Sequence, residues 1–267
     1  MNLNKIQKEL KKFDRYRFYE KEHRYAYVDD DEHEIEISTS VTSLIHQYVN
    51  PFNEEKAASI KSQKENIPKE EILKQWHLDN QFSRYKGTIT HLYNENLWKG
   101  NTYQYDKESI IQEFGRDCIE PIWDSLKRIS DSFYQKFHDH LIPIGLEQVV
   151  GSIDYDIAGT IDFLAYSKKL DSIIIIDYKT NKEIKRRSFQ NQKMLFPFDN
   201  IIDSNYYHYS LQLATYKWIL EKETNLKISS KKWLIWIHEN NSDYKIYECV
   251  NLDEEVKKIL EERRIKG

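Results

Sequence analysis

The chain has 267 residues, of which 39% are hydrophobic and 31% are charged, and its formal net charge at pH 7 is −4. That length can bury the core of a single globular domain, and no apolar run approaches the length of a membrane span. With only two cysteines, Cys118 and Cys249, no disulfide framework is expected. The first ten residues lack the apolar core of a signal peptide, so we expect a cytoplasmic protein with no membrane partner.

The first predicted structure is a hairpin followed by a short helix. Residues 25–28 and 34–37 are short strand-forming runs on either side of an acidic turn at residues 29–32. The segment Ser40–Ile45 then predicts a helix that begins with a serine or threonine cap. Further helices are predicted at residues 53–62, 68–77, 81–98 and 106–140, with Pro121 as a kink or break in the last.

From residue 144 onward the pattern changes from helical to mostly strand-forming. Strands are predicted at residues 146–152, 155–166, 172–179, 232–238 and 244–250, and helices at residues 206–222 and 253–264. We therefore expect an α/β (α+β) fold that forms one continuous domain. A helical N-terminal portion, residues 1–140, would wrap around a core, residues 141–267, that holds a central mixed sheet flanked by helices.

The most informative residues lie in a predicted hairpin around the polar break at residues 168–171. Counting outward from this break pairs Asp162 with Asp177. The two carboxylates would then lie opposite each other on one face, with Cβ atoms roughly 5 Å apart. Because like charges so placed repel, we expect a cation between them, and a hard divalent ion such as Mg²⁺ prefers oxygen ligands.

Lys179 adds a positive charge to the same face. It lies two residues beyond Asp177, so in a strand its side chain points the same way. The preceding run Ile173–Ile176 has no polar alternation, which indicates a strand covered on both faces. A charge at the end of such a strand needs a partner or a role, because burying it alone is expensive. Phosphodiester hydrolysis can be catalysed by such a set of groups, namely two carboxylates, a divalent ion and an ammonium group.

This arrangement resembles the signature of the PD-(D/E)XK nuclease superfamily. Asp162 followed by Asp177-Tyr178-Lys179 matches the Asp…Asp-X-Lys pattern. The flanking residues 158–162 (AGTID) and Thr180 are similar to the RecB-type branch, which includes nuclease domains of bacterial recombination helicases and mitochondrial genome maintenance exonucleases. The resemblance runs in order from about residue 40 to about residue 236. It implies a restriction-endonuclease-like core and a bacterial or phage-encoded enzyme.

Other residues fit the same branch, and each also has a simpler explanation. The matching positions are a helical metal-binding histidine at His91 in the segment 86–91, a strand glutamate at Glu147, and a Q-x-x-x-Y element at Gln212 and Tyr216. Without the resemblance, His91 would be an ordinary helical histidine and Glu147 a strand-edge ion-pair partner. Gln212 and Tyr216 lie four residues apart on one helical face and would be ordinary helix surface or core.

The resemblance also implies which residues hold the metal. Asp162 and Asp177 would bind one or two ions together with the main-chain carbonyl of Tyr178 and His91, and Glu147 is a further candidate ligand. Imidazole suits Mn²⁺ better than Mg²⁺, so such a site should accept both ions. Two cysteines are too few for the four-cysteine iron–sulfur cluster that some relatives carry, so none is expected.

The remaining matched residues would act on water and substrate. Lys179 would orient the attacking water or help to deprotonate it, and as a compact point charge it suits that role better than arginine. Gln212 would position the substrate or Lys179, and Tyr216 would contact a phosphate.

A run of basic residues follows Lys179, with only Glu183 against it. It comprises Lys182, Lys185, Arg186, Arg187 and Lys193. Beside a metal site these side chains would bind passing phosphates, and the alternative is a solvated charged loop. The chain also has 19 tyrosines and 6 tryptophans, which offer candidate stacking faces for single-stranded bases.

We therefore expect a metal-dependent DNA exonuclease that acts on single-stranded DNA or DNA ends. The alternatives are a structure-specific or restriction-type endonuclease, and a non-catalytic nucleic-acid-binding protein with the same fold. The intact set of Asp162, Asp177 and Lys179 favours an enzyme, and no dedicated target-recognition region is visible in the sequence. A helicase or another replication or repair partner is left open.

Overall fold

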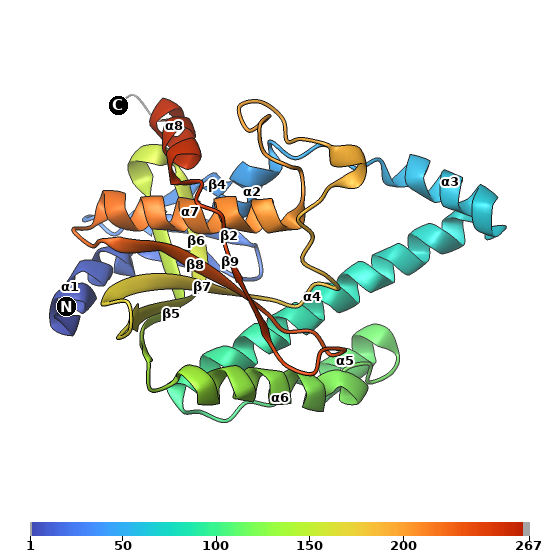
Figure 1. The fold of residues 1–267 in the computed structure, drawn as a ribbon, viewed down its shortest axis with the longest axis horizontal. Helices are drawn as coiled ribbons and strands as arrows, with labels where there is room; N and C mark the ends of the chain where they lie inside the picture. Colours follow the sequence, from blue (N-terminus) through green and yellow to red (C-terminus); the bar gives the residue numbers. More distant parts are fainter. Residues whose placement is uncertain (1, 264–267) are drawn as a thin grey trace.

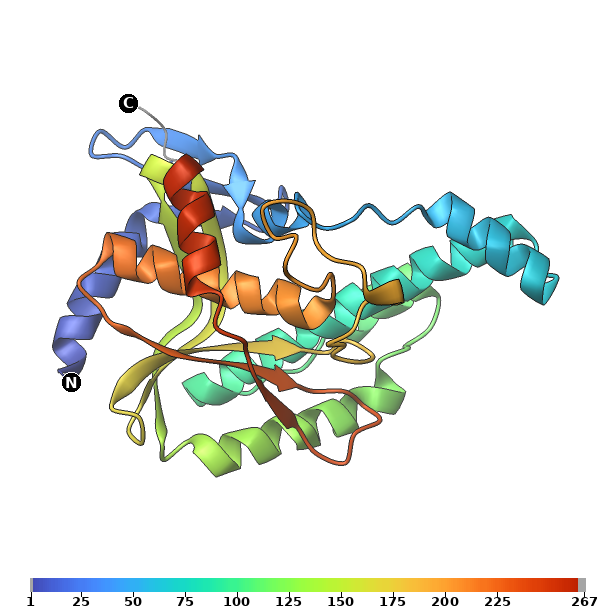
Figure 2. The same cartoon turned by 45° about the horizontal axis from the view of Figure 1, so that its top comes forward.

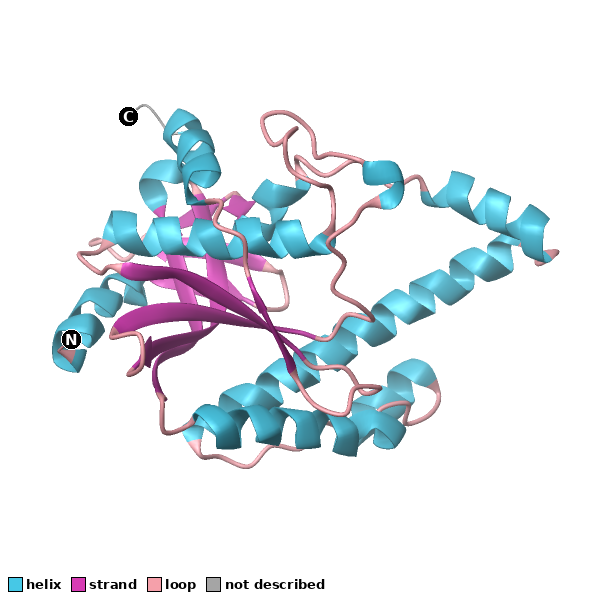
Figure 3. Ribbon diagram, viewed as in Figure 1, coloured by secondary structure: helices cyan, strands magenta, loops and turns pink. Residues whose placement is uncertain are grey.

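A mixed β-sheet with helices on both faces forms the centre of the protein, whose residues 2–263 are described by a computed structural model (Figures 1 and 3). The strand order is β4-β6-β7-β8-β9, and β5 pairs with β6. β4 is parallel to β6 and β7 is parallel to β8, while the other neighbours are antiparallel. The strands are β4 Thr39–Ser40, β5 Leu141–Ser152, β6 Ile157–Ser167, β7 Ser172–Lys179, β8 Ile228–Trp236 and β9 Lys245–Glu248. The predicted α/β fold with a mixed sheet is confirmed.

β7 is buried on both faces, as its unbroken isoleucine run predicts. Ile173 and Ile175 pack in the cluster that includes α7 (Asn205–Glu223). Ile174 and Ile176 pack in the opposite cluster, with α6 (Glu120–Phe137) and the end of α4 (Lys69–Lys99). Figure 1 shows α7 on one side of the sheet and α6 with α4 on the other. Any side chain at the end of β7 is therefore held between two packed layers.

The β6–β7 hairpin has the predicted register but a shorter ladder. Its turn spans residues 168–171, and Ser167 lies opposite Ser172. The ladder ends at Phe163 opposite Ile176, so the expected pairing of Asp162 with Asp177 in the ladder does not form. The physical reason is that the two strands have different further neighbours: the start of β6 lies between β4 and β5, while the end of β7 follows β8. The sheet therefore opens between Asp162 on β6 and Asp177 on β7, and we call this opening the fork.

The N-terminal portion contains more than helices. Its elements are α1 Leu3–Leu10, β1 Tyr16–Tyr19, β2 Arg24–Val28, β3 Glu34–Ile37, α2 Val41–His46, α3 Glu54–Glu65 and α5 Lys107–Phe114, with a 3₁₀ turn at Lys11–Arg15. The predicted hairpin is β2–β3, and β1 extends it into a three-stranded sheet. Ser40 caps α2 in a capping box with Ser43, as predicted. Because β4 of this portion pairs with β6, the boundary at residue 140 stays a prediction.

The predicted helices at 68–77 and 81–98 form one continuous helix, α4, of 31 residues. The prediction of two helices was wrong because residues 78–80 carry no glycine or proline, and nothing else there interrupts the helix. In Figure 2 the first half of α4 and α3 project from the body as an arm, and the second half passes along the sheet. The break predicted near Pro121 is confirmed, since α5 ends before it and Pro121 lies in the first turn of α6.

The C-terminal part ends in β9 and α8 (Asp253–Arg263), and residue 264 of the predicted last helix lies outside the described residues. Short 3₁₀ turns occur at Ile153–Tyr155 and Phe189–Asn191. None of the helices within residues 2–263 combines the length and the apolar character needed to cross a bilayer.

Candidate active site

The fork between β6 and β7 leaves the backbone amide and carbonyl of one β7 residue, Tyr178, for side chains to bind. Beyond Ile176 the strand pairs only with β8. On the fork side the Tyr178 amide donates to Asp162 Oδ2 at 2.8 Å, and the Tyr178 carbonyl oxygen lies 3.0 Å from His91 Nε2. Side chains thus satisfy backbone groups that a sheet neighbour would otherwise pair. The same arrangement brings a carboxylate, an imidazole and a carbonyl oxygen together.

His91 lies on α4, and its side chain extends to the fork. Its Nδ1 lies 3.4 Å from Asp162 Oδ2, and its ring stands edge-on to the Tyr178 ring. A buried ion pair between Lys86 and Glu239, at 2.9 Å, joins the same helix to the chain just beyond β8. Lys86 is 5% exposed and lies five residues before His91. This pair, which the sequence did not single out, holds α4 against the end of β8.

Glu147 on β5 completes a group of possible metal ligands. One ligand atom each from His91, Glu147 and Asp162 lie within 4.8 Å of one another. Glu147 has φ of 47°, a left-handed conformation that non-glycine residues rarely adopt. Its neighbours in β5 stay paired with β6 on both sides, Leu146 with Phe163 and Gln148 with Ile161. A strained residue held between paired neighbours points to a site rather than to a defect.

Asp177 and Lys179 lie on the α7 side of the fork. Lys179 Nζ is 2.6 Å from Asp177 Oδ2, and both side chains are largely buried. The ammonium group also lies 4.5 Å from the centroid of the Tyr209 ring. Tyr209 donates its hydroxyl to Asn181 Oδ1 at 2.8 Å. Sequence reasoning missed Tyr209, although it lies three residues before Gln212 and therefore on the same face of the helix.

The charges of these groups shift each other's pKa. Burial opposes the charged form of His91, but the Asp162 carboxylate outweighs it and raises the His91 pKa to about 9. For Asp162, burial is likewise outweighed by His91, and its pKa is lowered. Burial and the charge of Asp162 raise the Glu147 pKa to about 8. Burial raises the Asp177 pKa to about 6, against the opposing charge of Lys179.

This donor set fits a divalent cation. Two carboxylates, an imidazole nitrogen and a carbonyl oxygen match the ligands of Mg²⁺ and Mn²⁺. Glu147 makes no ion pair or hydrogen bond with another described residue, and its pKa is raised chiefly by burial and by the charge of Asp162. A cation held by these residues would stabilise the ionised form of Glu147 and would favour the neutral form of His91, which can bind a metal. Asp177, which already faces Lys179, is a further carboxylate at the edge of the group.

Comparison with known proteins agrees with this geometry. A family model described as the PD-(D/E)XK nuclease superfamily matches residues 15–264. The chain belongs to that superfamily. PD-(D/E)XK nucleases use divalent metals, in keeping with the ligand group of His91, Glu147 and Asp162. No curated protein matches the sequence significantly.

Solved structures also match, at low similarity. A protein from Eubacterium rectale named "Putative exonuclease" is 12% identical over 66% of this chain, with a TM-score of 0.39. The match spans 64% of that protein's chain, which is less than two thirds of its length. The protein SSO0001 is 17% identical, with 66% of this chain and 83% of that chain covered and a TM-score of 0.26. Neither likeness bears on the chemistry of the site.

In this PD-(D/E)XK nuclease, Gln212 and Tyr216 lie together on α7. Gln212 Nε2 donates to the Tyr216 hydroxyl at 3.3 Å, and Tyr216 is 3% exposed. The Tyr216 ring packs so close to β6 that a Cβ on Gly159 would meet its Cε1 at 2.8 Å. Tyr216 is thus buried against β6, and its hydroxyl accepts the hydrogen bond from Gln212. The predicted roles of both residues stay predictions.

The predicted nucleic-acid-binding residues lie in the loop between β7 and α7, but they differ in their surroundings. Lys185 pairs with Glu183 at 2.7 Å, Arg186 lies 4.5 Å above the Tyr206 ring, and Lys193 donates to the Asn200 carbonyl. Lys182, Lys185 and Arg187 all line a surface hollow that adjoins Asn181. Three residues of the predicted cluster thus have partners in the protein, whereas Lys182 and Arg187 form no ion pair within residues 2–263.

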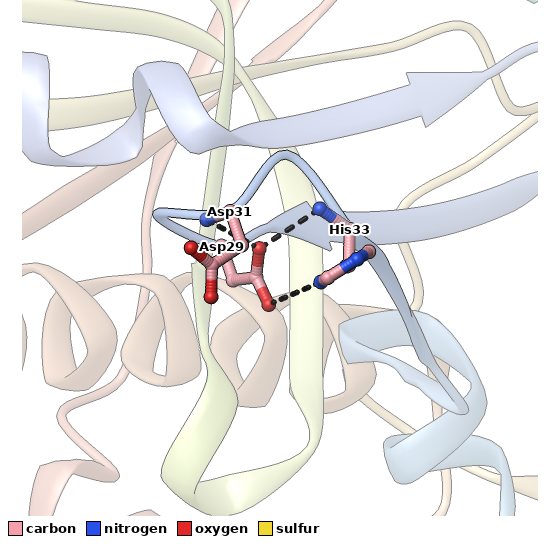
Figure 4. Close-up of side chains that lie close together, drawn as sticks. All are labelled: Asp29, Asp31 and His33. Carbon is pink, nitrogen blue, oxygen red and sulfur yellow. Dashed lines mark hydrogen bonds and ion pairs between the residues drawn. The ribbon is translucent and has the colours of Figure 1, made fainter.

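A second group of possible metal ligands, Asp29, Asp31 and His33, lies in the turn between β2 and β3 (Figure 4). Asp29 Oδ1 accepts the backbone amides of Asp31 at 2.9 Å and His33 at 2.8 Å. The Asp29 carboxylate is therefore engaged in shaping the hairpin turn, which lowers its pKa chiefly through the His33 amide. The Asp29 carboxylate of this turn therefore has a structural role without an ion.

Proposed function

We propose that this PD-(D/E)XK nuclease is a Mg²⁺- or Mn²⁺-dependent DNA exonuclease of the RecB-type branch, acting on single-stranded DNA or DNA ends. One observation carries the proposal: His91, Glu147, Asp162 and the Tyr178 carbonyl converge at the fork, next to the Asp177–Lys179 pair. These elements are far apart in the sequence, so their convergence is a property of the fold. The match of residues 15–264 to the nuclease superfamily supports the same chemistry.

The ligand group would hold the ion through His91, Glu147, Asp162, Asp177 and the Tyr178 carbonyl. A divalent ion bound there supplies a Lewis acid for the scissile phosphate and lowers the pKa of a bound water. Two of these ligands are already held by other groups, Asp162 by the Tyr178 amide and His91 by the Asp162 carboxylate. Ligands fixed before the ion arrives need little reorganisation when it binds.

Lys179 would stabilise negative charge next to the ligand group. Its side chain is held between Asp177 and the Tyr209 ring, and these contacts, with Asp177 foremost, outweigh burial and raise its pKa above the usual value. It therefore stays protonated at neutral pH and serves as a fixed positive charge and hydrogen-bond donor, which orients the attacking water and offsets charge on the phosphate. Of its two predicted roles, the structure favours orienting the water over deprotonating it.

Gln212 would contact the substrate from the α7 side. Its amide is held by the buried Tyr216 hydroxyl, and the two residues share a helical face with Tyr209. That face therefore presents an ordered amide beside the aromatic ring under Lys179. Gln212 is then a substrate-contacting residue, and Tyr209 and Tyr216 are positioning residues.

The test is product analysis with end-labelled DNA. The full chain is incubated with linear single-stranded, linear duplex and closed circular DNA, in Mg²⁺, in Mn²⁺ and in EDTA. We expect the linear substrates to shorten from their ends, the circles to stay uncut, and EDTA to stop the reaction. Asp177→Asn should abolish shortening and leave the circular dichroism spectrum unchanged, whereas Asp171→Asn, in the hairpin turn of the same strand pair, should not affect it.

Other outcomes would contradict specific parts of the proposal. Cutting of closed circles would identify an endonuclease. Full activity in EDTA, or in Asp177→Asn, would remove the fork as the active site. If no DNA were cut but labelled DNA still bound, the chain would be a nucleic-acid-binding protein with the nuclease fold.

A further inference from the structure

A surface hollow adjoins the candidate active site on the side of α7. It lies between the loop that follows β7 and the first turn of α7, and its lining includes Asn181, Lys182, Arg187, Phe189, Asn205 and His208. A chain of contacts joins it to the site. Lys179 Nζ lies over the ring of Tyr209, and Tyr209 donates its hydroxyl to the side chain of Asn181. The hollow is therefore connected to Lys179 through Asn181 and Tyr209.

Phe189 stands in the wall of this hollow with 79% of its surface exposed. A well-defined turn presents it: Gln192 N–H donates to the Phe189 carbonyl, and Ser188 donates its hydroxyl to the Gln192 carbonyl. The two residues after Phe189 have left-handed φ angles, Gln190 with 51° and Asn191 with 56°. Such conformations cost energy and tend to occur where the backbone serves a ligand. A phenylalanine held in water by a strained turn offers a flat apolar face.

The hollow also carries unbalanced positive charge. Its two acidic side chains already have partners: Glu183 pairs with Lys185 at 2.7 Å, and Asp203 accepts hydrogen bonds from His208 at 2.7 Å and from the Asn50 backbone amide at 2.9 Å. Lys182 and Arg187, in contrast, form no ion pair within residues 2–263. An occupant that complements this surface needs a flat aromatic group for Phe189 and an anion for the two cations. A nucleotide combines both.

We propose that the hollow binds one unpaired nucleotide of a DNA strand, with its base stacked on Phe189 and its phosphate held by Lys182 and Arg187. The assignment rests on the proposed nuclease function, because a strand bound in the hollow would continue into the adjoining active site and be cleaved there. Only an unpaired base offers its face for stacking on a side chain, since the bases of a duplex cover each other. The hollow therefore selects single strands and frayed ends, and leads the strand toward Lys179.

Binding of short labelled DNA tests this assignment. Fluorescence anisotropy measures the affinity of the full chain for a fluorescein-labelled thymidine oligonucleotide and for a blunt duplex, in Ca²⁺ so that cleavage is slow. Stacking on one aromatic side chain predicts that Phe189→Ala weakens single-strand binding about 5- to 150-fold. Duplex binding should stay unchanged, and Phe189→Trp should keep the single-strand affinity.

Phe196→Ala is the matched control. Phe196 lies in the same loop and is 81% exposed, but it does not line the hollow. Its loss should leave both affinities unchanged. Lys182→Ala or Arg187→Ala should weaken single-strand binding and reduce its dependence on salt by about one phosphate contact each.

The assignment is overturned if Phe189→Ala binds the oligonucleotide like the unaltered chain. It is also overturned if the variant loses single-strand and duplex binding equally, or if Phe196→Ala loses as much. These results differ from a failure of the proposed function. A chain that shortens DNA while Phe189→Ala binds normally loses only the hollow's role. A chain that binds single strands through Phe189 but cuts no DNA loses the proposed nuclease activity.

Discussion

His91 Nε2 lies 3.0 Å from the main-chain oxygen of Tyr178, across the gap between α4 and the end of β7. With the proton on Nε2, His91 donates to this oxygen, while Asp162 lies beside its other nitrogen at 3.4 Å. The imidazolium thus bridges two oxygens that are also proposed metal ligands. An ion and the His91 proton compete for the same place, so the metal and the pH act on one equilibrium.

The first prediction is that ion binding becomes tighter as pH rises. In the ion-free protein the pKa of Glu147 is raised to about 8 and that of His91 to about 9. Both groups must lose a proton before they bind metal, so binding releases protons below these values. Calorimetric titration with Mn²⁺ in two buffers of different ionisation enthalpy measures this release at each pH. An affinity that does not change between pH 7 and pH 9 would contradict the assigned ligands.

The same groups predict how pH affects the stability of the ion-free protein. Each has a higher pKa in the folded chain than its ordinary value, 4.5 for Glu147 and 6.5 for His91. Their contribution to the free energy of unfolding is fully present below those ordinary values. It is lost as pH rises through about 8 for Glu147 and about 9 for His91. We therefore expect thermal unfolding in EDTA to shift to lower temperature across this range. Glu147→Gln should flatten the shift, because the amide does not ionise.

The next prediction concerns His91 itself. Loss of one ligand should raise the Mn²⁺ concentration needed for activity by at least about 10-fold, since even partners of metal ligands contribute about 10- to 100-fold. A metal titration of His91→Ala should therefore recover part of the rate at high Mn²⁺. His77→Ala is the control, because His77 lies on the same helix and is exposed. Equal titration curves for the two variants would make His91 an ordinary helical histidine.

Local sequence patterns predicted β7, the register of its hairpin and the Ser40 cap. These features depend on residues close in the chain: the isoleucine run, the polar break at 168–171, and a serine before an apolar pattern. The resemblance to a nuclease family placed His91, Glu147 and Gln212 on a list of candidates. The structure brings His91, Glu147 and Asp162 together and leaves Gln212 with Tyr216 on the adjoining helix.

The fork was not predictable from the hairpin alone. Perfect pairing would continue to Asp162 and Asp177, but the competing neighbours β4, β5 and β8 draw the strands apart. Those neighbours come from distant parts of the chain, so no local pattern reports them. The left-handed φ of Glu147 was not predictable either. A strand pattern in the sequence does not show which residue is turned out of its ladder.

Two glycines provide a prediction about packing near the site. A Cβ on Gly159 would meet Tyr216 Cε1 at 2.8 Å, whereas a Cβ on Gly87 would meet Thr180 Oγ1 at an ordinary 3.6 Å. Gly159→Ala should therefore lower the free energy of unfolding by about 1–3 kcal/mol, the usual cost of overpacking. Gly87→Ala, inside α4, should raise it by about 0.5–1 kcal/mol, because alanine favours a helix. Urea unfolding of both variants measures the difference, and similar values for the two would refute the close contact.

Lys179→Met should separate chemistry from binding. Methionine keeps most of the side-chain volume between Asp177 and the Tyr209 ring but removes the charge. No ligand atom is lost, so Mn²⁺ should still bind. Substrate should bind too, because Lys182 and Arg187 remain in the adjoining hollow. The missing charge acts on the transition state, so the rate of single-turnover cleavage should fall about 10²–10³-fold.

Lys182→Met is the matched variant for this last prediction, because Lys182 lies in the hollow three residues along the chain and makes no ion pair in the described part of the protein. It should weaken DNA affinity and leave the single-turnover rate at saturating DNA nearly unchanged. If instead Lys179→Met weakened DNA affinity and Lys182→Met slowed cleavage, Lys179 would contact the DNA strand and lie away from the attacking water. Measuring DNA affinity in Ca²⁺ beside single-turnover cleavage in Mg²⁺ distinguishes the two, since a stabiliser of the transition state changes the second measurement and not the first.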